Sequence, residues 1–481
     1  MRLDSTIHRV YTLANTMFIA GRTRSIVIIG GGVSGTLVAV NVLRLAKAGT
    51  RITLVEKSPP IGRGVAYGTD QSEHLLNVPA GRMSVWPEDP EHFLRWMGER
   101  LGRVGYPDAV ASGDFLPRRL FGDYVASVFA AARQNVAADV NIEVVVGEAV
   151  DVEECNDGTA RVVLADQRVL AADRVVLALG VLPGEYPIRR SLRFFHGLRY
   201  VHIPWQSEAL EGVGKRDDVL IVGQGLTSLD IIVQLERLGH VGKIHAVSRR
   251  GLRPQVHRLG PAWSPFFAGK PFPRTVRALF RRVREEVATA AGKGIDWRAV
   301  IDAIRPQSAE LWSALSWEER ARFMRHVRPF WEVHRHRLPP PTASRVDRLV
   351  ALGRLEFFAG RLESLVDEGP VTEAVIRLRG KDERRVLRVA KVINCTGPRS
   401  DYSKYQHPLL INLLARGLID HDPLALGLHA MPSGEVFRYR GGPLPWLYTL
   451  GAPLKGTLWE STAVPEIRVH AAMIARSLVA D

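Results

Sequence analysis

An apolar strand that runs straight into a glycine-rich turn constrains the fold of this chain more than any other feature. Ser25–Ile29 reads SIVII, a β-branched run typical of a buried parallel strand. Gly30, Gly32 and Gly35 then fit the pattern G-x-G-x-x-G, and a helical pattern follows over residues 36–45. The first glycine of this pattern allows a tight bend, the second lets the backbone approach a pyrophosphate, and the third lets the helix pack closely on the strand. The turn therefore predicts a phosphate-binding site at a helix N-terminus.

A second strand and an acidic residue stand at the spacing that this motif requires. Residues 51–55 form another apolar strand pattern, which ends at Glu56, 21 residues after Gly35. A carboxylate at that position accepts a hydrogen bond from the ribose 2′-OH of a dinucleotide. Strand, turn, helix, strand and acid in register predict a Rossmann-like dinucleotide-binding domain, rather than a glycine-rich turn without a ligand.

A second copy of the motif follows about 190 residues later. The apolar strand Val219–Val222 leads into residues 223–228, which read GQGLTS, so that Ser228 replaces the third glycine with another small residue. The next predicted strand ends in Arg249 and Arg250 where the first copy has an acid. An arginine accommodates the 2′-phosphate that a carboxylate would repel, so this copy is expected to bind NADP rather than NAD. The alternative is that the two arginines only add to the basic surface.

The two glycine motifs head two copies of one architecture. In each copy an alternating strand pair and a buried strand follow the motif, and a glycine closes the unit. The second copy is longer, because residues 273–337 carry a helical pattern with arginines opposite an apolar face formed by Val276, Leu279, Phe280, Val283 and Val287. We therefore predict an α/β fold of two Rossmann-like domains with a helical insertion in the second. The expected divisions are an N-terminal extension over 1–24, an FAD-binding domain over 25–185 and 390–481, and an NADPH-binding domain over 186–389 with its insertion at about 270–340.

Composition excludes several classes of protein. Of 481 residues, 46% are hydrophobic and 24% charged, the balance of a globular chain rather than a disordered or collagen-like one. No stretch reaches the 18 apolar residues of a membrane span. The net charge of +15 is spread along the chain without a nucleic-acid-binding motif, which favours a solvated basic surface. Cys155 and Cys395 form neither a disulfide framework nor a CxxC pair, which favours a reducing, cytoplasmic location.

Longer stretches of the sequence resemble a known group of flavoproteins. Two dinucleotide folds in this order, flavin first and nicotinamide second, resemble the two-dinucleotide-binding flavoprotein superfamily, although the cysteine pair of its thiol-reductase branch is absent. Residues 76–90, LNVPAGRMSVWPEDP, and residues 115–118, FLPR, are similar to segments of the flavin-containing monooxygenases. Their F-x-G-x-x-x-H-x-x-x-W fingerprint is degraded here: residues 195–205 keep its Phe, Gly and Trp, but His202 is one position late.

The closest resemblance is to the bacterial FAD-NAD(P)-binding family, and it covers nearly the whole chain after residue 24. It is carried by residues 75–86, 248–257, 331–337, 394–398 and 456–468. The resemblance implies an FAD- and NADPH-dependent monooxygenase that uses O₂ and oxygenates a nucleophilic nitrogen, or a sulfur, of a small molecule through a C4a-(hydro)peroxyflavin. The alternatives are an NAD(P)H oxidase or dehydrogenase without oxygen insertion, and a flavin-binding redox sensor.

Candidate site residues follow from the motifs and from the resemblance. Asn77 is the candidate catalytic residue, since the resemblance implies that it could hydrogen-bond the flavin peroxide; the alternative is a turn residue, because Asn-x-Pro is turn chemistry. His334–Arg337 forms a basic cluster that could bind an anionic cofactor or a carboxylate substrate, or could simply end a helix; no metal site is expected there. The residues expected to contact FAD or NADPH are Gly30, Gly32, Val33, Ser34, Gly35, Glu56, Lys57, Gly64, Val150, Gly180, Gly223, Gly225, Thr227, Ser228, Arg249, Arg250, Thr396, Gly397, Gly451 and Thr462.

Overall fold

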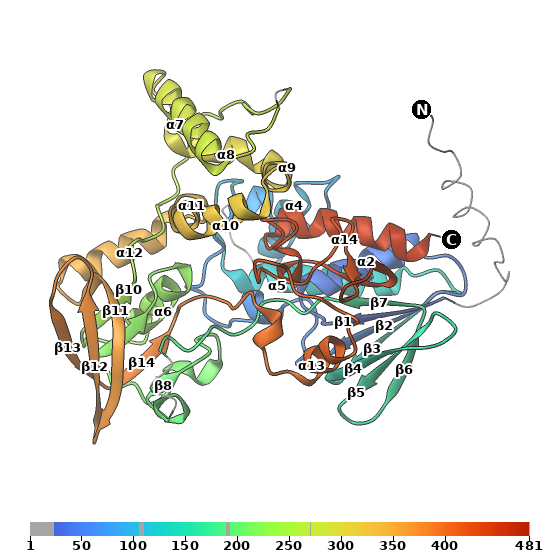
Figure 1. Cartoon of the computed structure of the whole chain (residues 1–481), viewed down its shortest axis with the longest axis horizontal. Coiled ribbons are helices and arrows are strands. Elements are labelled where there is room, and N and C mark those ends of the chain that lie inside the picture. Colours follow the sequence, from blue (N-terminus) through green and yellow to red (C-terminus); the bar gives the residue numbers. More distant parts are fainter. Residues whose placement is uncertain (1–23, 105–109, 189–192, 270, 481) are drawn as a thin grey trace.

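The chain folds into two α/β units that lie side by side, with a group of helices above them (Figure 1). This computed structural model describes residues 24–104, 110–188, 193–269 and 271–480. The expected N-terminal extension therefore lies outside the described residues, apart from Arg24. The α/β class predicted from the sequence is confirmed, and each predicted glycine turn lies in its own mainly parallel sheet.

The first unit is a six-stranded sheet in the order β15-β16-β7-β1-β2-β3, in which β16, β7, β1, β2 and β3 are parallel. Alternate side chains of its central strand enter two cores: Ile26 and Ile28 face a helical layer, whereas Val27 and Ile29 face a small antiparallel sheet, β4-β5-β6. The strands are β1 (Ser25–Ile29), β2 (Arg51–Glu56), β3 (Asn141–Val146), β4 (Ala149–Glu154), β5 (Ala160–Leu164), β6 (Val169–Ala172), β7 (Arg174–Leu177), β15 (Glu435–Phe437) and β16 (Pro443–Thr449).

Helices from both ends of the chain cover this sheet. The last helix packs directly against the first one, so the C-terminal segment completes the first unit (Figure 1). Arg24, just before β1, contacts the C-terminal end of the last helix: its guanidinium donates to the carbonyls of Leu478 and Ala480 at 3.2 and 2.5 Å. The helices of this unit are α2 (Val33–Leu45), α3 (Gly64–Tyr67), α4 (His92–Val104), α5 (Arg118–Gln134), α13 (Pro408–Ala415) and α14 (Val464–Val479).

The second unit is a seven-stranded sheet in the order β13-β12-β11-β10-β9-β14-β8. Here the antiparallel strands continue the main sheet, because β11 pairs with β10 on one side and with β12 on the other. Because β14 pairs with β9, this sheet extends past the boundary at residue 390 that the sequence suggested. The elements are β8 (Tyr200–Val201), β9 (Val219–Val222), β10 (Ile244–Ser248), β11 (Leu355–Glu368), β12 (Val371–Leu378), β13 (Arg384–Val389), β14 (Lys391–Asn394), α6 (Leu226–Arg237) and α12 (Pro340–Ala351).

In the described part of the sequence between β10 and α12 there are five α-helices. They have their own apolar cores, and the indole N–H of Trp312 donates to the carbonyl of Gly456 at 2.8 Å, which joins them to the C-terminal part of the first unit. The predicted apolar face of the first helix is wrong at Phe280, which is 48% exposed and lies beside Arg277, Arg281 and Arg284 of the same helix. The helices are α7 (Val276–Gly292), α8 (Trp297–Ile304), α9 (Ser308–Ser313), α10 (Trp317–His326) and α11 (Arg328–Arg335).

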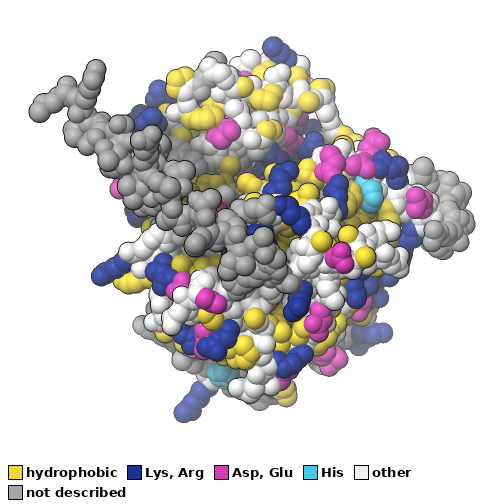
Figure 2. Space-filling model, turned by 90° about the vertical axis from the view of Figure 1, so that its right-hand side faces the viewer, with side chains coloured by type: hydrophobic (Ala, Val, Ile, Leu, Met, Phe, Trp, Pro, Cys, Tyr) yellow, Lys and Arg dark blue, Asp and Glu magenta, His cyan; other side chains and the backbone are white. Residues whose placement is uncertain are grey.

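The surface agrees with a dispersed positive charge. On the face in Figure 2, lysine and arginine side chains alternate with acidic ones and do not gather into one field. Among the described residues no helix has the length and apolar content needed to cross a membrane.

Candidate functional site

The first glycine turn is shaped by contacts that leave no room for side chains. Gly30 has a φ of +106°, and a Cβ there would lie 2.3 Å from the carbonyl oxygen of Ala178. A Cβ on Gly35 would lie 1.9 Å from the carbonyl oxygen of Gly30. Since β1, α2 and the residue after β7 meet at this point, the two glycines let the helix begin directly against the sheet. Val33 is buried in the first turn of α2, and Ser34 is next to it.

A second glycine loop lies against the first. A Cβ on Gly64 would come within 3.2 Å of the Cα of Gly32, so two backbones meet here without side chains. Beside them, at the end of β2, Glu56 accepts a hydrogen bond from the backbone N–H of Gly31 at 2.7 Å. This bond orients one carboxylate oxygen toward the glycine turn, and the other oxygen accepts from the backbone N–H of Ser58 at 2.8 Å. The neighbouring Lys57 instead extends along the surface to Glu148, at 3.1 Å.

Three further residues expected to contact the flavin, Gly451, Gly180 and Val150, each contact a segment from a distant part of the chain. A Cβ on Gly451 would lie 3.0 Å from Ser34 Oγ. The carbonyl of Gly451 accepts a hydrogen bond from the hydroxyl of Ser461 at 2.8 Å, and Thr462 is the next residue of the chain. Gly180 follows β7, and its carbonyl accepts from Tyr402 at 2.6 Å. Val150 lies in the small sheet, where its carbonyl accepts from Asn412 at 3.0 Å.

Thr396 and Gly397 lie elsewhere than the other expected flavin contacts. They follow β14 in the second sheet, and the Thr396 hydroxyl donates to Asn394 at 2.8 Å. A Cβ on Gly184 would come within 2.7 Å of the carbonyl oxygen of Gly397. Thr396 and Gly397 therefore lie between Gly184, in the segment after β7, and the second glycine turn at Gly223.

The second glycine turn repeats the first with one substitution. Gly223 has a φ of +121°, and a Cβ there would lie 2.1 Å from the carbonyl oxygen of Cys395. At the third position Ser228 is buried, and its hydroxyl donates to the carbonyl of Gly225 at 2.6 Å. Serine fits because this bond folds its side chain back onto the start of α6. The neighbouring Thr227 is half-buried in the first turn of the helix.

The two arginines that the sequence singled out follow β10 directly, and their side chains have different surroundings. Arg249 is exposed, whereas Arg250 turns toward the insertion and donates to the carbonyl of Arg325 at 3.2 Å. Arg379, from the turn after β12, lies within 3.5 Å of the Arg249 carbonyl. Sequence reasoning missed Arg379, because nothing local indicates that this hairpin turn reaches the end of β10.

Asn77 lies where the two units touch. Its carbonyl accepts a hydrogen bond from His257 Nε2 at 3.0 Å, and His257 comes from the second unit. The ring of Phe115 lies 4.8 Å from the His257 ring. Burial lowers the pKa of His257 to about 4, so the imidazole is neutral at physiological pH. His257 lies in the 248–257 stretch noted above, but a histidine in a loop gave no signal of its own.

A buried ion pair joins the units beside Asn77. Arg118, the first residue of α5, lies 2.8 Å from Asp230 of α6, and both side chains are largely buried. Arg118 Nε also donates to the carbonyl of Leu75 at 3.0 Å, and its guanidinium lies 5.3 Å from the ring centre of Trp205. We call the contact line formed by residues 71–77 with the second unit the seam.

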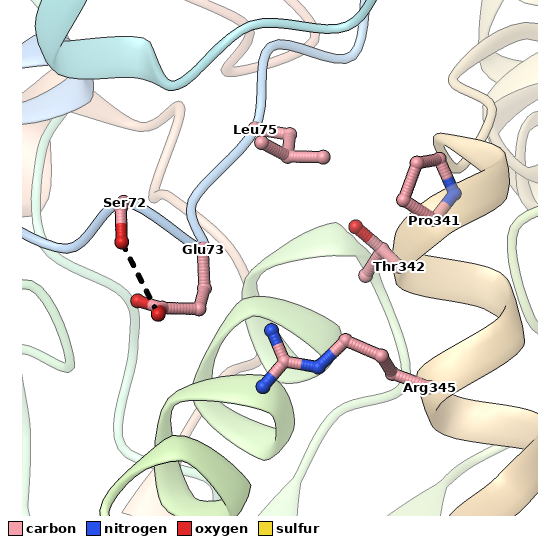
Figure 3. A pocket seen from close by; sticks show the side chains of 6 residues that line it. All are labelled: Ser72, Glu73, Leu75, Pro341, Thr342 and Arg345. Carbon is pink, nitrogen blue, oxygen red and sulfur yellow. Dashed lines mark hydrogen bonds between the residues drawn. The ribbon is translucent and has the colours of Figure 1, made fainter.

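A small cavity opens at the outer end of the seam (Figure 3). Glu73 and Arg345 extend into it from opposite sides, and Thr342 and Pro341 of α12 form one wall. Both charged groups already have partners: Glu73 lies 3.0 Å from Arg237, and Arg345 lies 2.6 Å from Glu236. The cavity is therefore bordered by ion pairs that hold the seam together.

The basic cluster after α11 is largely satisfied by acids. Arg335 pairs with Glu460 at 3.2 Å, and Arg337 pairs with Asp302. The expectation that this cluster could bind an anion is not met by these two arginines, because acidic side chains already occupy them. In the described ranges no group of histidine, cysteine and acidic side chains could hold a metal ion.

Comparisons with known proteins agree with this architecture. Residues 27–182 match the family model described as FAD-NAD(P)-binding. No curated protein matches the sequence.

Solved structures match almost the whole chain. Ornithine hydroxylase (PvdA) from Pseudomonas aeruginosa, in its reduced form, is 17% identical with a TM-score of 0.63, over 95% of this chain and 99% of that one. Ornithine N-hydroxylase KtzI from Kutzneria sp. 744, with reduced FAD, NADP⁺ and L-ornithine, is 16% identical with a TM-score of 0.62, over 95% and 99%. DfoA from Erwinia amylovora, a cadaverine monooxygenase bound to FAD, is 12% identical with a TM-score of 0.62, over 94% of each chain.

At these identities the structural likeness establishes the fold, and the family match covers the first glycine turn, Glu56 and Gly180. Residues 27–182 thus match a model described as FAD-NAD(P)-binding, and the chain as a whole shares the fold of these solved structures.

Proposed function

We propose that this protein is an FAD- and NADPH-dependent monooxygenase that oxygenates a nucleophilic nitrogen of a small molecule. The observation that carries the proposal is the position of Asn77, which lies on the seam between the two α/β units. Its carbonyl accepts a hydrogen bond from His257 of the second unit, and Arg118 donates to the carbonyl of Leu75, two residues earlier. The printed substrates of similar structures, ornithine and cadaverine, are amines, which supports the choice of nitrogen. The overall reaction is RNH₂ + O₂ + NADPH + H⁺ → RNHOH + NADP⁺ + H₂O.

The first turn fits the pyrophosphate and ribose of FAD. α2 begins after its N-cap residue Gly32, with no side-chain cap and no acid in its first turn, so no such side chain competes for its first N–H groups. Glu56 would take the ribose hydroxyl, and Gly64 and Gly451 would let the cofactor pass close to the backbone. FAD supplies the electron transfer and oxygen activation that no side chain can provide.

The chain's own residues orient the reactants and exclude water. Asn77 would offer its side-chain amide as a hydrogen-bond donor beside the reacting oxygen, where no hydrogen bond to another described residue holds it. The seam's ion pairs, Arg118–Asp230 and Arg237–Glu73, close the interface around it. Such a closed, preorganised site favours transfer of oxygen to substrate over its loss to water.

The direct test is product analysis. Purified protein with NADPH and O₂ should convert one member of a panel of amines, diamines and amino acids to a product 16 mass units heavier, detected by mass spectrometry. Sulfides in the same panel test the alternative nucleophile. If H₂O₂ equals the NADPH consumed with every compound, the protein is an oxidase and the proposal is wrong.

The first prediction concerns the flavin. The purified protein should carry FAD, because the glycine turn and Glu56 fit the pyrophosphate and adenosine ribose, which FMN lacks. Heat should release a yellow compound with the mass of FAD. Release of FMN, or failure of the protein to take up FAD on reconstitution, would contradict this expectation.

The second prediction concerns the nicotinamide cofactor. Arg249→Ala should raise the KM for NADPH about tenfold, because a charge-assisted bond to the 2′-phosphate of about 1.5 kcal/mol is lost. The KM for NADH should change less than twofold. Arg250→Ala should have a smaller effect, since Arg250 donates to a backbone carbonyl of α10.

Arg388→Ala provides the control for this experiment, since Arg388 is an exposed arginine of the same sheet that pairs with Glu368 at 3.3 Å. It should leave both KM values unchanged. Steady-state rates with each cofactor give the answer, and an equal rise for NADPH and NADH in Arg249→Ala would show that Arg249 does not contact the 2′-phosphate.

A further inference from the structure

A loop of the second unit reaches across the seam to Asn77. This crossing loop, residues 251–258, leaves the end of β10 and leads toward the insertion. Two contacts fix it: the backbone N–H of Leu338 donates to the Gln255 carbonyl at 2.8 Å, and Arg298 Nε donates to the Val256 carbonyl at 2.7 Å. The loop therefore has a fixed path, although it contains no helix or strand.

His257 is the residue of this loop that contacts the first unit at Asn77. Its backbone N–H donates to Leu338 at 2.9 Å, which fixes the main chain, while its ring reaches away to the Asn77 carbonyl. A carbonyl oxygen only accepts, so Nε2 carries the proton in this bond. Phe115 packs against the ring and limits its rotation. The main chain of His257 is thus fixed by the second unit, and its ring Nε2 is bound to the first unit.

The Asn77 segment has a second anchor two residues away. Arg118 Nε donates to the Leu75 carbonyl, and the same guanidinium pairs with Asp230 of the second unit. Two carbonyls of one short segment are therefore bound by groups that depend on the docking of the second unit. The backbone position of Asn77 therefore depends on how the second unit packs against the first.

From this geometry we propose that His257 is a positioning residue that fixes Asn77 through its backbone carbonyl, so that oxygen transfer depends on docking of the NADPH-binding unit. The proposal rests on the monooxygenase function above. His257 does not touch the reacting atoms. Its role is to keep the Asn77 side chain aimed at one place while the oxygen is transferred.

The test compares three variants of the holoenzyme. His257→Phe keeps an aromatic ring beside Phe115 but removes the donor. His257→Gln restores a donor at the position of Nε2. His240→Phe is the matched control, because His240 Nε2 also donates to a backbone carbonyl, that of Asp217 at 2.8 Å, and is buried in the same unit away from the seam.

Two measurements are made on each variant. The first is the ratio of oxygenated product to NADPH consumed, together with H₂O₂. The second is hydrogen–deuterium exchange of the peptide that spans residues 74–83, which needs no turnover. In His257→Phe we expect product per NADPH to fall about tenfold, H₂O₂ to rise to match, and exchange in this peptide to become about tenfold faster. Flavin reduction by NADPH should stay within twofold of wild type.

His257→Gln should recover most of the coupling and of the protection, and His240→Phe should keep both. Unchanged coupling and exchange in His257→Phe would overturn the proposal, as would an equal loss in His240→Phe. A wild-type enzyme that makes only H₂O₂ would instead overturn the proposed function. In that case unchanged exchange in His257→Phe would overturn the positioning role as well, and faster exchange would support it.

Discussion

Replacing Arg118 with methionine should lower the free energy of unfolding by about 3–5 kcal/mol at neutral pH, because it leaves Asp230 buried without its partner. The Asp230 side chain is only 7% exposed, and burial raises the pKa of its carboxyl to about 6 even with Arg118 beside it. Methionine fills similar space but cannot compensate the charge. It also leaves the Leu75 carbonyl without a donor.

The cost should depend on pH in a defined direction. A carboxyl whose pKa is raised by folding stabilises the native state below its unfolded pKa of about 4, and this contribution is lost as the pH rises through its folded pKa. Removing Arg118 raises the pKa of Asp230 further. The variant should therefore be least stable relative to wild type at pH 8, and the difference should shrink toward pH 5, where the carboxyl is protonated.

Urea unfolding at pH 5 and pH 8 tests this prediction, with two controls. Arg118→Met combined with Asp230→Leu should recover most of the lost stability, since no unpaired charge is then buried. Arg100→Met should cost about 1 kcal/mol or less, because Arg100 is an exposed arginine that lies 3.0 Å from Asp123. A loss in Arg118→Met that is the same at both pH values, or that the double variant does not relieve, would show that Asp230 is not the cause.

Local sequence patterns were sufficient for the fold. The run SIVII followed by Gly30, Gly32 and Gly35 predicts β1, the turn and α2, because each feature acts over a few residues: β-branching, tight backbone approach and helix initiation. The same holds for the second turn and for the helical insertion. The antiparallel strands were also expected, but not that β11 would carry them directly into the second sheet.

The site residues that the sequence did not reveal depend on tertiary contacts. His257 lies 180 residues from Asn77, and Arg379 lies 130 residues from Arg249. No periodicity relates such pairs, so only the folded structure places them together. The same limit explains the basic cluster: Arg335 appeared available for an anion in the sequence, but Glu460 occupies it in the structure.

Both the local sequence and the tertiary contacts bear on the role of Asn77. The sequence left two explanations for this residue, a hydrogen-bond donor to activated oxygen and a turn residue that satisfies its own backbone. In the structure its carbonyl accepts from His257, while the nearby backbone N–H groups of Leu76 and Ala80 donate to the carbonyls of Leu116 and Asp114. The turn is therefore supported by neighbours, and its shape does not need the Asn77 amide.

Asn77→Ala should consequently uncouple the enzyme rather than unfold it. We expect FAD content and NADPH-driven flavin reduction to stay near wild type, while product per NADPH falls about ten- to a hundredfold, since losing one donor to a strongly polar group costs about 1.5–3 kcal/mol. H₂O₂ should rise by the amount that product falls. Asn77→Asp keeps the shape and the turn but has no N–H to donate, so it should uncouple as well.

The control is Asn135→Ala, which removes an amide that donates to the Ala131 carbonyl at 3.0 Å at the exposed end of α5. It should leave coupling unchanged. Simultaneous assays of NADPH, H₂O₂ and product, with thermal unfolding of each variant, separate the two explanations. A turn residue would show lower stability or weaker FAD retention in Asn77→Ala with coupling intact in the folded fraction. Asn77→Asp preserves the turn but adds a charge, whereas Asn77→Ala adds none. Uncoupling in both variants at normal stability would therefore point to the donor that both lack.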